Sequence, residues 1–318
     1  MRIPSYLLLL LALLMTGAAC AEEFNKNCSM GMALGQEVKT DCSVRWEYEG
    51  KVYCFSSNAS KDMFLMNKQD NLRKAKAFQE KMGTSVKEKV TTVEAREMIR
   101  KSGPNNIADF SGKDLSYQDL SGLDLRHARF VDTNLFGADL RGANFSGADL
   151  TDAYLNLARI ENTNFSHANL TNATMFQPIY EKNIFKGAKL VNARIIGTLG
   201  AVDMSDADVR NGRLGLDIGN QPMGQMRLDA VGGNFANSNF SGADMNRSNL
   251  IFSNFTNANL SNTNLFRADF SKADLTGADL TGADLGEAVL DGTILKDVKG
   301  LDTVKGMATT KGKCAGCK

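Results

Sequence analysis

The chain has 318 residues, of which 43% are hydrophobic and 23% are charged, with 37 basic and 36 acidic side chains. This composition excludes a disordered chain, and a net charge of +1 excludes both the basic surface of a general nucleic-acid binder and the acidic surface of a DNA mimic. The chain has 29 glycines but only 2 histidines, and such a small number of histidines argues against imidazole catalysis and against zinc bound by several histidines. We therefore expect a globular or solenoid protein without bound nucleic acid.

Residues 1–21 have the pattern of a secretory signal peptide. Arg2 supplies a positive charge, residues 7–15 form an apolar run, and small residues follow. Two processing routes remain open. The chain is cleaved before Glu22, or before Cys20 with a lipid attached there, because residues 17–20 resemble a bacterial lipobox. The sequence predicts export to the periplasm or cell envelope, with membrane attachment only if Cys20 is lipidated.

Residues 24–85 form a separate module. Residues 45–48 and 52–55 are strand-like and flank Glu49-Gly50, which predicts a hairpin. Beyond Phe64 we expect a helix with one apolar face, made of Leu72, Ala75, Phe78 and Met82. Cys42 and Cys54 would readily form a disulfide in an oxidising compartment.

The same module carries a group of soft sulfur atoms. Its members are Cys28, Met30, Met32, Met63 and Met66. Thiolate and thioether sulfur suit Cu(I), so the group is a candidate copper site. Methionines also fill irregular cores, and that simpler interpretation stays open.

Three stretches of this module, residues 28–32, 48–56 and 61–64, resemble the YHS domain over about residues 24–66. The resemblance implies a small α+β module associated with metal. The later cysteines of that family correspond to Ser56 and Ser60 here, so this chain departs from the family pattern at two positions.

Residues 91–104 are expected to form a capping helix. Thr91 and Glu94 have the spacing of a capping box, and the segment directly precedes a long repeat. The open end of a repeat structure has to be covered to block edge pairing, which is the role we expect for this helix.

A five-residue repeat dominates the rest of the chain. A large apolar residue, the centre of each unit, recurs at every fifth position from Phe110 to Ile195 and again from Phe235 to Leu295. A small residue, such as Ala143 or Ala278, stands two positions before most centres. This period matches neither the 3.6 of a helix nor the 2.0 of a strand, so repetition itself must build the fold.

The units Ala-Asn-Phe-Ser-Gly at 143–147 and Ala-Asp-Leu-Thr-Gly at 278–282 resemble the pentapeptide-repeat family. The resemblance implies an all-β solenoid, a right-handed quadrilateral β-helix over residues 105–195 and 235–298, with four units per coil. Residues 20 apart should then stack. We expect Phe145, Phe165 and Phe185 on one side and Phe235 and Phe255 on another, in a rod of roughly 40 Å.

Between these halves the repeat changes register. Met204, Val209 and Leu214 keep the five-residue step but are shifted by one position, and residues 215–222 have no repeat. We expect an irregular insertion or loop over 196–234, bridging a gap of a whole number of coils. It is either a tolerated surface insertion or a loop that recognises a partner.

The expected tail, residues 299–318, ends with Cys314-Ala-Gly-Cys317. Three interpretations stay open: an exposed disulfide, half of a metal site, or a thiol-exchange pair.

No nucleophile elbow, phosphate loop or histidine-paired metal motif is present, so we do not expect an enzyme. The leading hypothesis is a non-enzymatic exported scaffold that binds another protein through the solenoid sides or the 196–234 insertion. The alternative is a periplasmic protein that binds or handles copper. Inhibition of a DNA topoisomerase by duplex mimicry, known in the pentapeptide family, conflicts with the predicted export.

Overall fold

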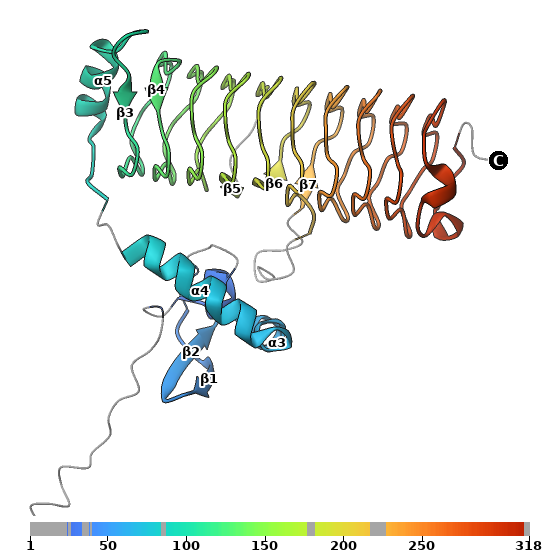
Figure 1. Cartoon of the computed structure of the whole chain (residues 1–318), viewed down its shortest axis with the longest axis horizontal. Coiled ribbons are helices and arrows are strands. Elements are labelled where there is room, and N and C mark those ends of the chain that lie inside the picture. Colours follow the sequence, from blue (N-terminus) through green and yellow to red (C-terminus); the bar gives the residue numbers. More distant parts are fainter. Residues whose placement is uncertain are drawn as a thin grey trace, which may run out of the picture. The chain divides into compact units, whose positions relative to one another are not determined.

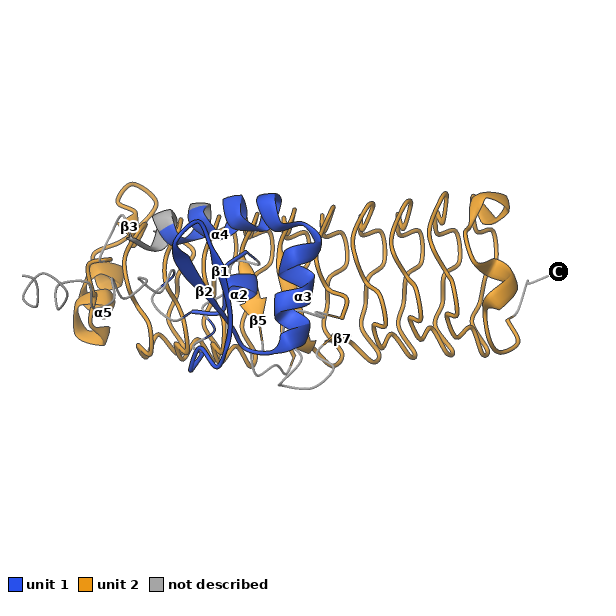
Figure 2. Ribbon diagram, turned by 90° about the horizontal axis from the view of Figure 1, so that it is seen from below, with its two compact units in different colours: residues 1–86, 218–224 blue, residues 87–217, 225–318 orange. Residues whose placement is uncertain are grey.

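The structure is a computed structural model that describes residues 24, 27–33, 38, 40–83, 87–176, 182–216 and 227–314. The chain divides into two compact units, Met1–Val86 with Ile218–Gly224, and Lys87–Asp217 with Gln225–Lys318 (Figure 2). The expected signal peptide with Cys20, the centre Tyr180, residues 217–226 of the expected loop and Cys317 lie outside the described residues.

The first unit contains the predicted hairpin. Strand β1 (Val44–Tyr48) pairs antiparallel with β2 (Lys51–Phe55), and Trp46 lies opposite Tyr53. Glu49 and Gly50 both have positive φ, which matches the tight two-residue turn that a twisted hairpin favours. The hairpin prediction is confirmed.

Three helices complete this unit: α2 (Ser29–Ala33), α3 (Asn58–Met66) and α4 (Lys68–Gly83). Helix α3 begins before Phe64, where we expected the helical part to start, because Ser57 and Ser60 form a capping box at its first turn. Leu72 and Ala75 are buried in the core of the unit and Phe78 packs against it, as predicted. The side chain of Met82 lies outside the described part.

The predicted disulfide between Cys42 and Cys54 is present. Cys54 lies on β2, whose residues Val52 to Phe55 are all buried. The bond therefore ties the segment before the hairpin to the centre of the unit, and it limits the conformations open to the unfolded chain.

The second unit begins with its cap. Helix α5 (Thr92–Arg100) has Thr91 as its N-cap, and both hydrogen bonds of the capping box with Glu94 are formed. Ala95 is fully buried against the solenoid core, and Met98 packs beside it. The predicted capping helix is confirmed.

Behind this cap the chain winds into stacked coils (Figure 1). Along one side, parallel bridges join residues in a single unbroken ladder: Lys89, Asp114, Asn134, Tyr154, Thr174, Arg194, Arg213, Asp244, Asn264, Asp284 and Lys305. Its ten steps of ~4.8 Å make this rod roughly 48 Å long, somewhat more than expected, because both ends of the ladder lie beyond the sequence repeat.

The short strands of the coils follow the same pairing. Strand β3 (Ala108–Asp109) pairs parallel with β4 (Ala128–Arg129), and β5 (Thr174–Phe176), β6 (Arg194–Thr198) and β7 (Leu228–Asp229) form a three-stranded parallel sheet. Partners 20 residues apart mean that four five-residue sides make a coil.

The interior is filled as predicted. All described centres from Phe110 to Leu295 are buried, and so are the alanines two positions before them. Phe145, Phe165 and Phe185 stack with ring centroids 5.1 and 4.9 Å apart. Large and small side chains thus alternate around a core with no room for water.

The expected insertion is much shorter than 196–234. Leu199, Met204, Val209, Leu214 and Ala230 are buried centres within regular coils. The extra residues lie between Leu214 and Leu228, whose backbones are joined by a hydrogen bond of 2.9 Å. Residues 217–226 of this stretch are outside the described part.

The prediction that the gap between Ile195 and Phe235 spans a whole number of coils is also wrong. Ile184 pairs with Asp203, nineteen residues on, and Asp203 pairs with Asn234, thirty-one residues on. One coil is one residue short and the next has eleven extra, so the 40 residues from Ile195 to Phe235 span one and a half coils. Phe235 and Phe255 therefore continue the side of Phe185 instead of occupying another.

The expected tail is a further coil. Lys299, Lys305 and Lys311 pair with Asp279, Asp284 and Val289. Two 3-10 turns, η3 (Leu301–Thr303) and η4 (Met307–Thr309), place partly buried apolar side chains against the last regular coil. This coil covers the carboxyl end of the solenoid.

Candidate functional site

The soft sulfur atoms of the first unit do not form one group. Cys28, Met30 and Met32 lie in its core and Met63 packs against it, whereas Met66 is 83% exposed at the end of α3. Met30 and Met32 are two residues apart on helix α2, about 200° around the axis, so they face different ways. Their alternate spacing would converge on a strand but diverges on a helix.

Cys28 instead meets two hydroxyl groups. Its Sγ lies 3.6 Å from Ser56 Oγ and 3.9 Å from Ser60 Oγ, and the two hydroxyls are 3.4 Å apart. The backbone N–H of Ser56 donates to the same sulfur at 3.4 Å. These serines hold the two positions singled out by the YHS resemblance, so the three positions do converge. One sulfur and two hydroxyls are nevertheless a poor donor set for Cu(I), which prefers soft ligands.

Apart from Cys28, the cysteines that the structure describes offer no thiolate to a soft metal in this state. Cys42 and Cys54 are bonded to each other, Cys314 is in a disulfide, and Cys28 is the free cysteine of the described residues. Within the described ranges no group of three or more His, Cys, Asp or Glu side chains could hold a metal ion. The same part of the chain contains no helix long and apolar enough to cross a membrane. Copper binding stays a prediction.

The aspartates of the repeat have a structural role. Asp274, Asp279 and Asp284 each accept a hydrogen bond through Oδ1 from the backbone N–H two residues on, at 2.9 Å. Hydrogen bonds from Thr281 lower the pKa of Asp279. Side chains of this kind fix the corner turns.

One side of the solenoid carries aromatic side chains at its surface, which we call the aromatic stripe: Tyr117, Phe136 and Tyr154, of which Phe136 and Tyr154 are half-buried. They come from three consecutive coils, with ring centroids of 5.4 Å between Tyr117 and Phe136 and 6.0 Å between Phe136 and Tyr154. Tyr117 is 72% exposed. Aromatic side chains are enriched at protein–protein interfaces, where they contribute much of the binding energy.

Sequence reasoning missed this stripe. Tyr117 lies two residues after its centre, Phe136 one residue after and Tyr154 one residue before, so the three do not occupy the same position of the five-residue unit. The 20-residue coil could have revealed it, because positions 114–117, 134–137 and 154–157 stack on one side.

The comparison with protein-family models agrees with the five-residue repeat. A model of pentapeptide repeats matches in eight copies within residues 108–147, 138–175, 234–265 and 258–297. A search of curated proteins found no match.

Three solved structures are similar to part of this chain. HetL, a pentapeptide repeat protein involved in heterocyst differentiation regulation in the cyanobacterium Nostoc sp. strain PCC 7120, is 25% identical, with 62% of this chain and 86% of HetL covered and a TM-score of 0.35. QnrB1, a plasmid-mediated fluoroquinolone resistance protein, is 20% identical over 57% and 88% of the two chains, with a TM-score of 0.34.

A pentapeptide repeat protein from the thylakoid lumen of Arabidopsis thaliana is 24% identical over 52% and 76% of the chains, with a TM-score of 0.14. The five-residue period, the parallel ladder of four-sided coils and the match to the family model agree. The solenoid of this chain is built of pentapeptide repeats.

Proposed function

We propose that the protein is a non-enzymatic, exported scaffold that binds another protein through a side of its solenoid. The observation that carries this proposal is the aromatic stripe, because Tyr117 exposes a large ring on a rigid surface that is otherwise mostly polar. The backbone of Tyr117 is fixed by its hydrogen bond to Phe136, and a tyrosine side chain has only two torsion angles, so little conformational freedom is lost on binding, which favours association.

Export is part of the proposal. Residues 1–21 have the composition of a signal peptide, and the disulfides at Cys42–Cys54 and at Cys314 are typical of oxidising compartments. For the first unit we propose a YHS-like module, supported by the hairpin and by the convergence of Cys28, Ser56 and Ser60.

A photo-crosslinking residue introduced at Tyr117 of the full chain tests the scaffold function. We expect a discrete crosslinked product with one other protein, and we expect Phe136→Ala to remove it, because both rings belong to the same contact surface. The matched control places the crosslinker at the exposed Asn262, which follows a centre on a different side. No protein product at Tyr117, or the same products at both positions, would overturn the proposal.

A further inference from the structure

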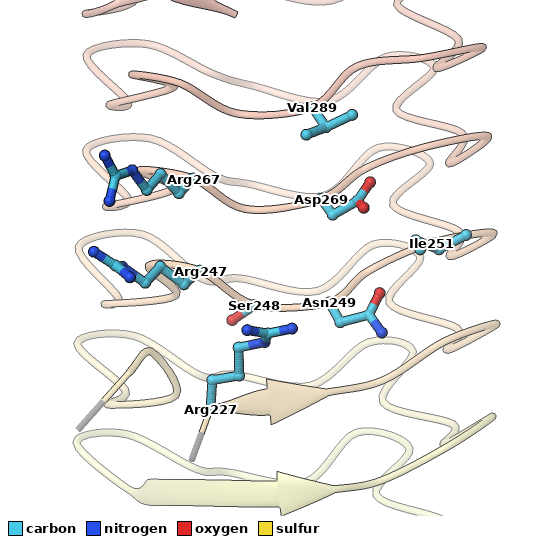
Figure 3. A pocket seen from close by; sticks show the side chains of 8 residues that line it. All are labelled: Arg227, Arg247, Ser248, Asn249, Ile251, Arg267, Asp269 and Val289. Atoms are coloured by element: carbon cyan, nitrogen blue, oxygen red, sulfur yellow. The ribbon is translucent and has the colours of Figure 1, made fainter. Parts of the chain in front are cut away.

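A recess of about 430 Å³ lies on the solenoid surface between Arg227 and Val289 (Figure 3). Three arginines 20 residues apart, Arg227, Arg247 and Arg267, lie one above another along one edge of it. The ladder of Asp229, Asn249, Asp269 and Val289 aligns four coils there, so neighbouring arginines start about 4.8 Å apart. We call this the arginine recess; its lining is completed by Ser248, Asn249, Ile251, Asp269 and Val289.

The positive charge of the arginine recess is only partly neutralised. Arg267 donates from Nε and Nη2 to the carboxylate of Glu287, at 2.9 and 3.1 Å. Within the described residues, Arg227 and Arg247 have no ion-pair partner, although both are half-buried. Partly desolvated guanidinium groups without a counter-charge are unfavourable, and an incoming anion would relieve this.

Other polar atoms at the recess also lack partners. The side chain of Ser248 is buried, with 1% exposed, and its Oγ makes no hydrogen bond. The Oδ1 atom of Asn249 is also buried and also makes no hydrogen bond. Asp269, the acidic residue of the lining, is engaged with Ser271, whose N–H and Oγ–H donate to its Oδ1 at 2.9 and 2.6 Å. Buried polar groups are normally satisfied, so the unpartnered ones beside two unpaired arginines point to a missing polar ligand.

The recess also has an apolar part. Ile251 and Val289 line it, and Phe252, directly after Ile251, is 57% exposed. A ligand that fits must therefore present a negative group to the arginines and an apolar group beside it.

We propose that the arginine recess binds the carboxylate side chains of an acidic segment of a partner protein, with an apolar residue of the same segment against Ile251. The proposal rests on the scaffold function and names the chemistry of the partner. Guanidinium forks match carboxylates in two-point hydrogen bonds. A carboxylate side chain flanked by an apolar residue suits the site better than a phosphate ion, because Ile251 and Val289 line the recess beside the arginines and a phosphate ion has no apolar part to place there.

Titration of the full chain with a short peptide of two adjacent glutamates flanked by leucines tests this at low salt, by calorimetry. Arg227→Gln and Arg247→Gln should each weaken binding roughly tenfold, as expected for loss of a charge-assisted hydrogen bond. Glu287→Gln should strengthen it several-fold, because it frees the third guanidinium group. Arg126→Gln, on another side and paired with Asp124, is the matched control and should leave binding unchanged.

Thermal melting of each variant shows that it is folded. The proposal is overturned if the native chain does not bind the peptide, if a peptide with glutamines binds equally, or if folded Arg227→Gln and Arg247→Gln bind like the native chain. Tighter binding of a phosphoserine peptide, or of inorganic phosphate, would overturn the carboxylate assignment. Peptide binding should survive Tyr117→Ala, so failure at the recess and failure of the aromatic stripe are separate results.

Discussion

Arg210 holds the carboxylate of Asp208 in a two-point fork, with Nε donating to Oδ1 and Nη2 donating to Oδ2, both at 2.8 Å. Asp124 with Arg126 and Asp139 with Arg141 repeat the arrangement, each pair flanking a buried centre. Hydrogen bonds from the arginine side chains lower the pKa values of Asp208, Asp124 and Asp139. The forks therefore link corner geometry to the charge of the aspartates.

The first prediction concerns acid. Because the pKa of each of these aspartates is lower in the folded chain than its ordinary value of 3.8, their stabilisation is complete above about pH 4. It is lost as the pH falls through the folded pKa. Melting temperature measured from pH 7 to pH 2 should therefore drop below about pH 4. A variant with Arg126, Arg141 and Arg210 all changed to Gln should show a smaller drop, and an identical drop would contradict the role of the forks.

The second prediction concerns the interior. Ala143 is buried two positions before Phe145, so Ala143→Leu should overpack the coil and destabilise it by roughly 1–3 kcal/mol or more. Ser146→Leu, on the outer surface of the same coil, should have little effect. Chemical denaturation of the two variants measures the difference, and equal midpoints would contradict the inward position of Ala143.

The third prediction concerns register. Three residues inserted after Gly277 should disrupt the solenoid, because such a slip turns inward side chains outward. Three residues inserted after Gly219 should be tolerated, since the coil that contains it already holds eleven extra residues. Circular dichroism and melting temperature compare the two variants, and equal losses of stability would contradict this difference.

The fourth prediction concerns metal. Ser56→Cys with Ser60→Cys should create a three-sulfur site with Cys28, because the three side chains already lie within 4 Å of one another. The variant should bind Cd²⁺ with a sulfur-to-metal charge-transfer absorption that the native chain lacks. Adding Cys28→Ser should weaken the absorption, and no absorption in the double variant would show that the positions do not form a site. Cu(I) titration of the reduced native chain tests the original sulfur group separately.

The solenoid could be predicted because its information is local and repeated. The inward position of each centre, such as Leu280, and of each small residue, such as Ala278, can be predicted from its place in the five-residue unit. The stacking of side chains then follows from the length of the coil. The capping helix and the hairpin could also be predicted. Thr91 with Glu94 is a specific signal for the start of the helix, and Glu49-Gly50 is a specific signal for the turn of the hairpin.

The break could not be resolved from the sequence, because a one-residue deletion and an eleven-residue insertion add up to ten. The resulting 40-residue gap looks like two coils. The last coil was hidden for a different reason: Gly300 and Gly306 stand where large centres would be, and Leu301, Val304 and Met307 supply the apolar contacts out of step.

The candidate sites were harder still. The sulfur-bearing residues lie close together in the sequence, which suggested a single site, but Met30 and Met32 face different ways on helix α2. The arginine recess leaves a trace in the sequence, in the 20-residue spacing of Arg227, Arg247 and Arg267. Its meaning depends on which arginines are already paired, which spacing does not reveal.

The net offset of ten residues also decides how the surface is oriented along the rod. Tyr117 and Arg247 each stand three residues after a member of the same ladder, Asp114 and Asp244, so they occupy the same corner despite the break between them. Adding or removing one pentapeptide between them would leave every coil intact but rotate the arginines a quarter turn away from the tyrosine. Gain or loss of a single five-residue unit could thus change which partner contacts both Tyr117 and the arginines, without any change in the residues that make the contacts.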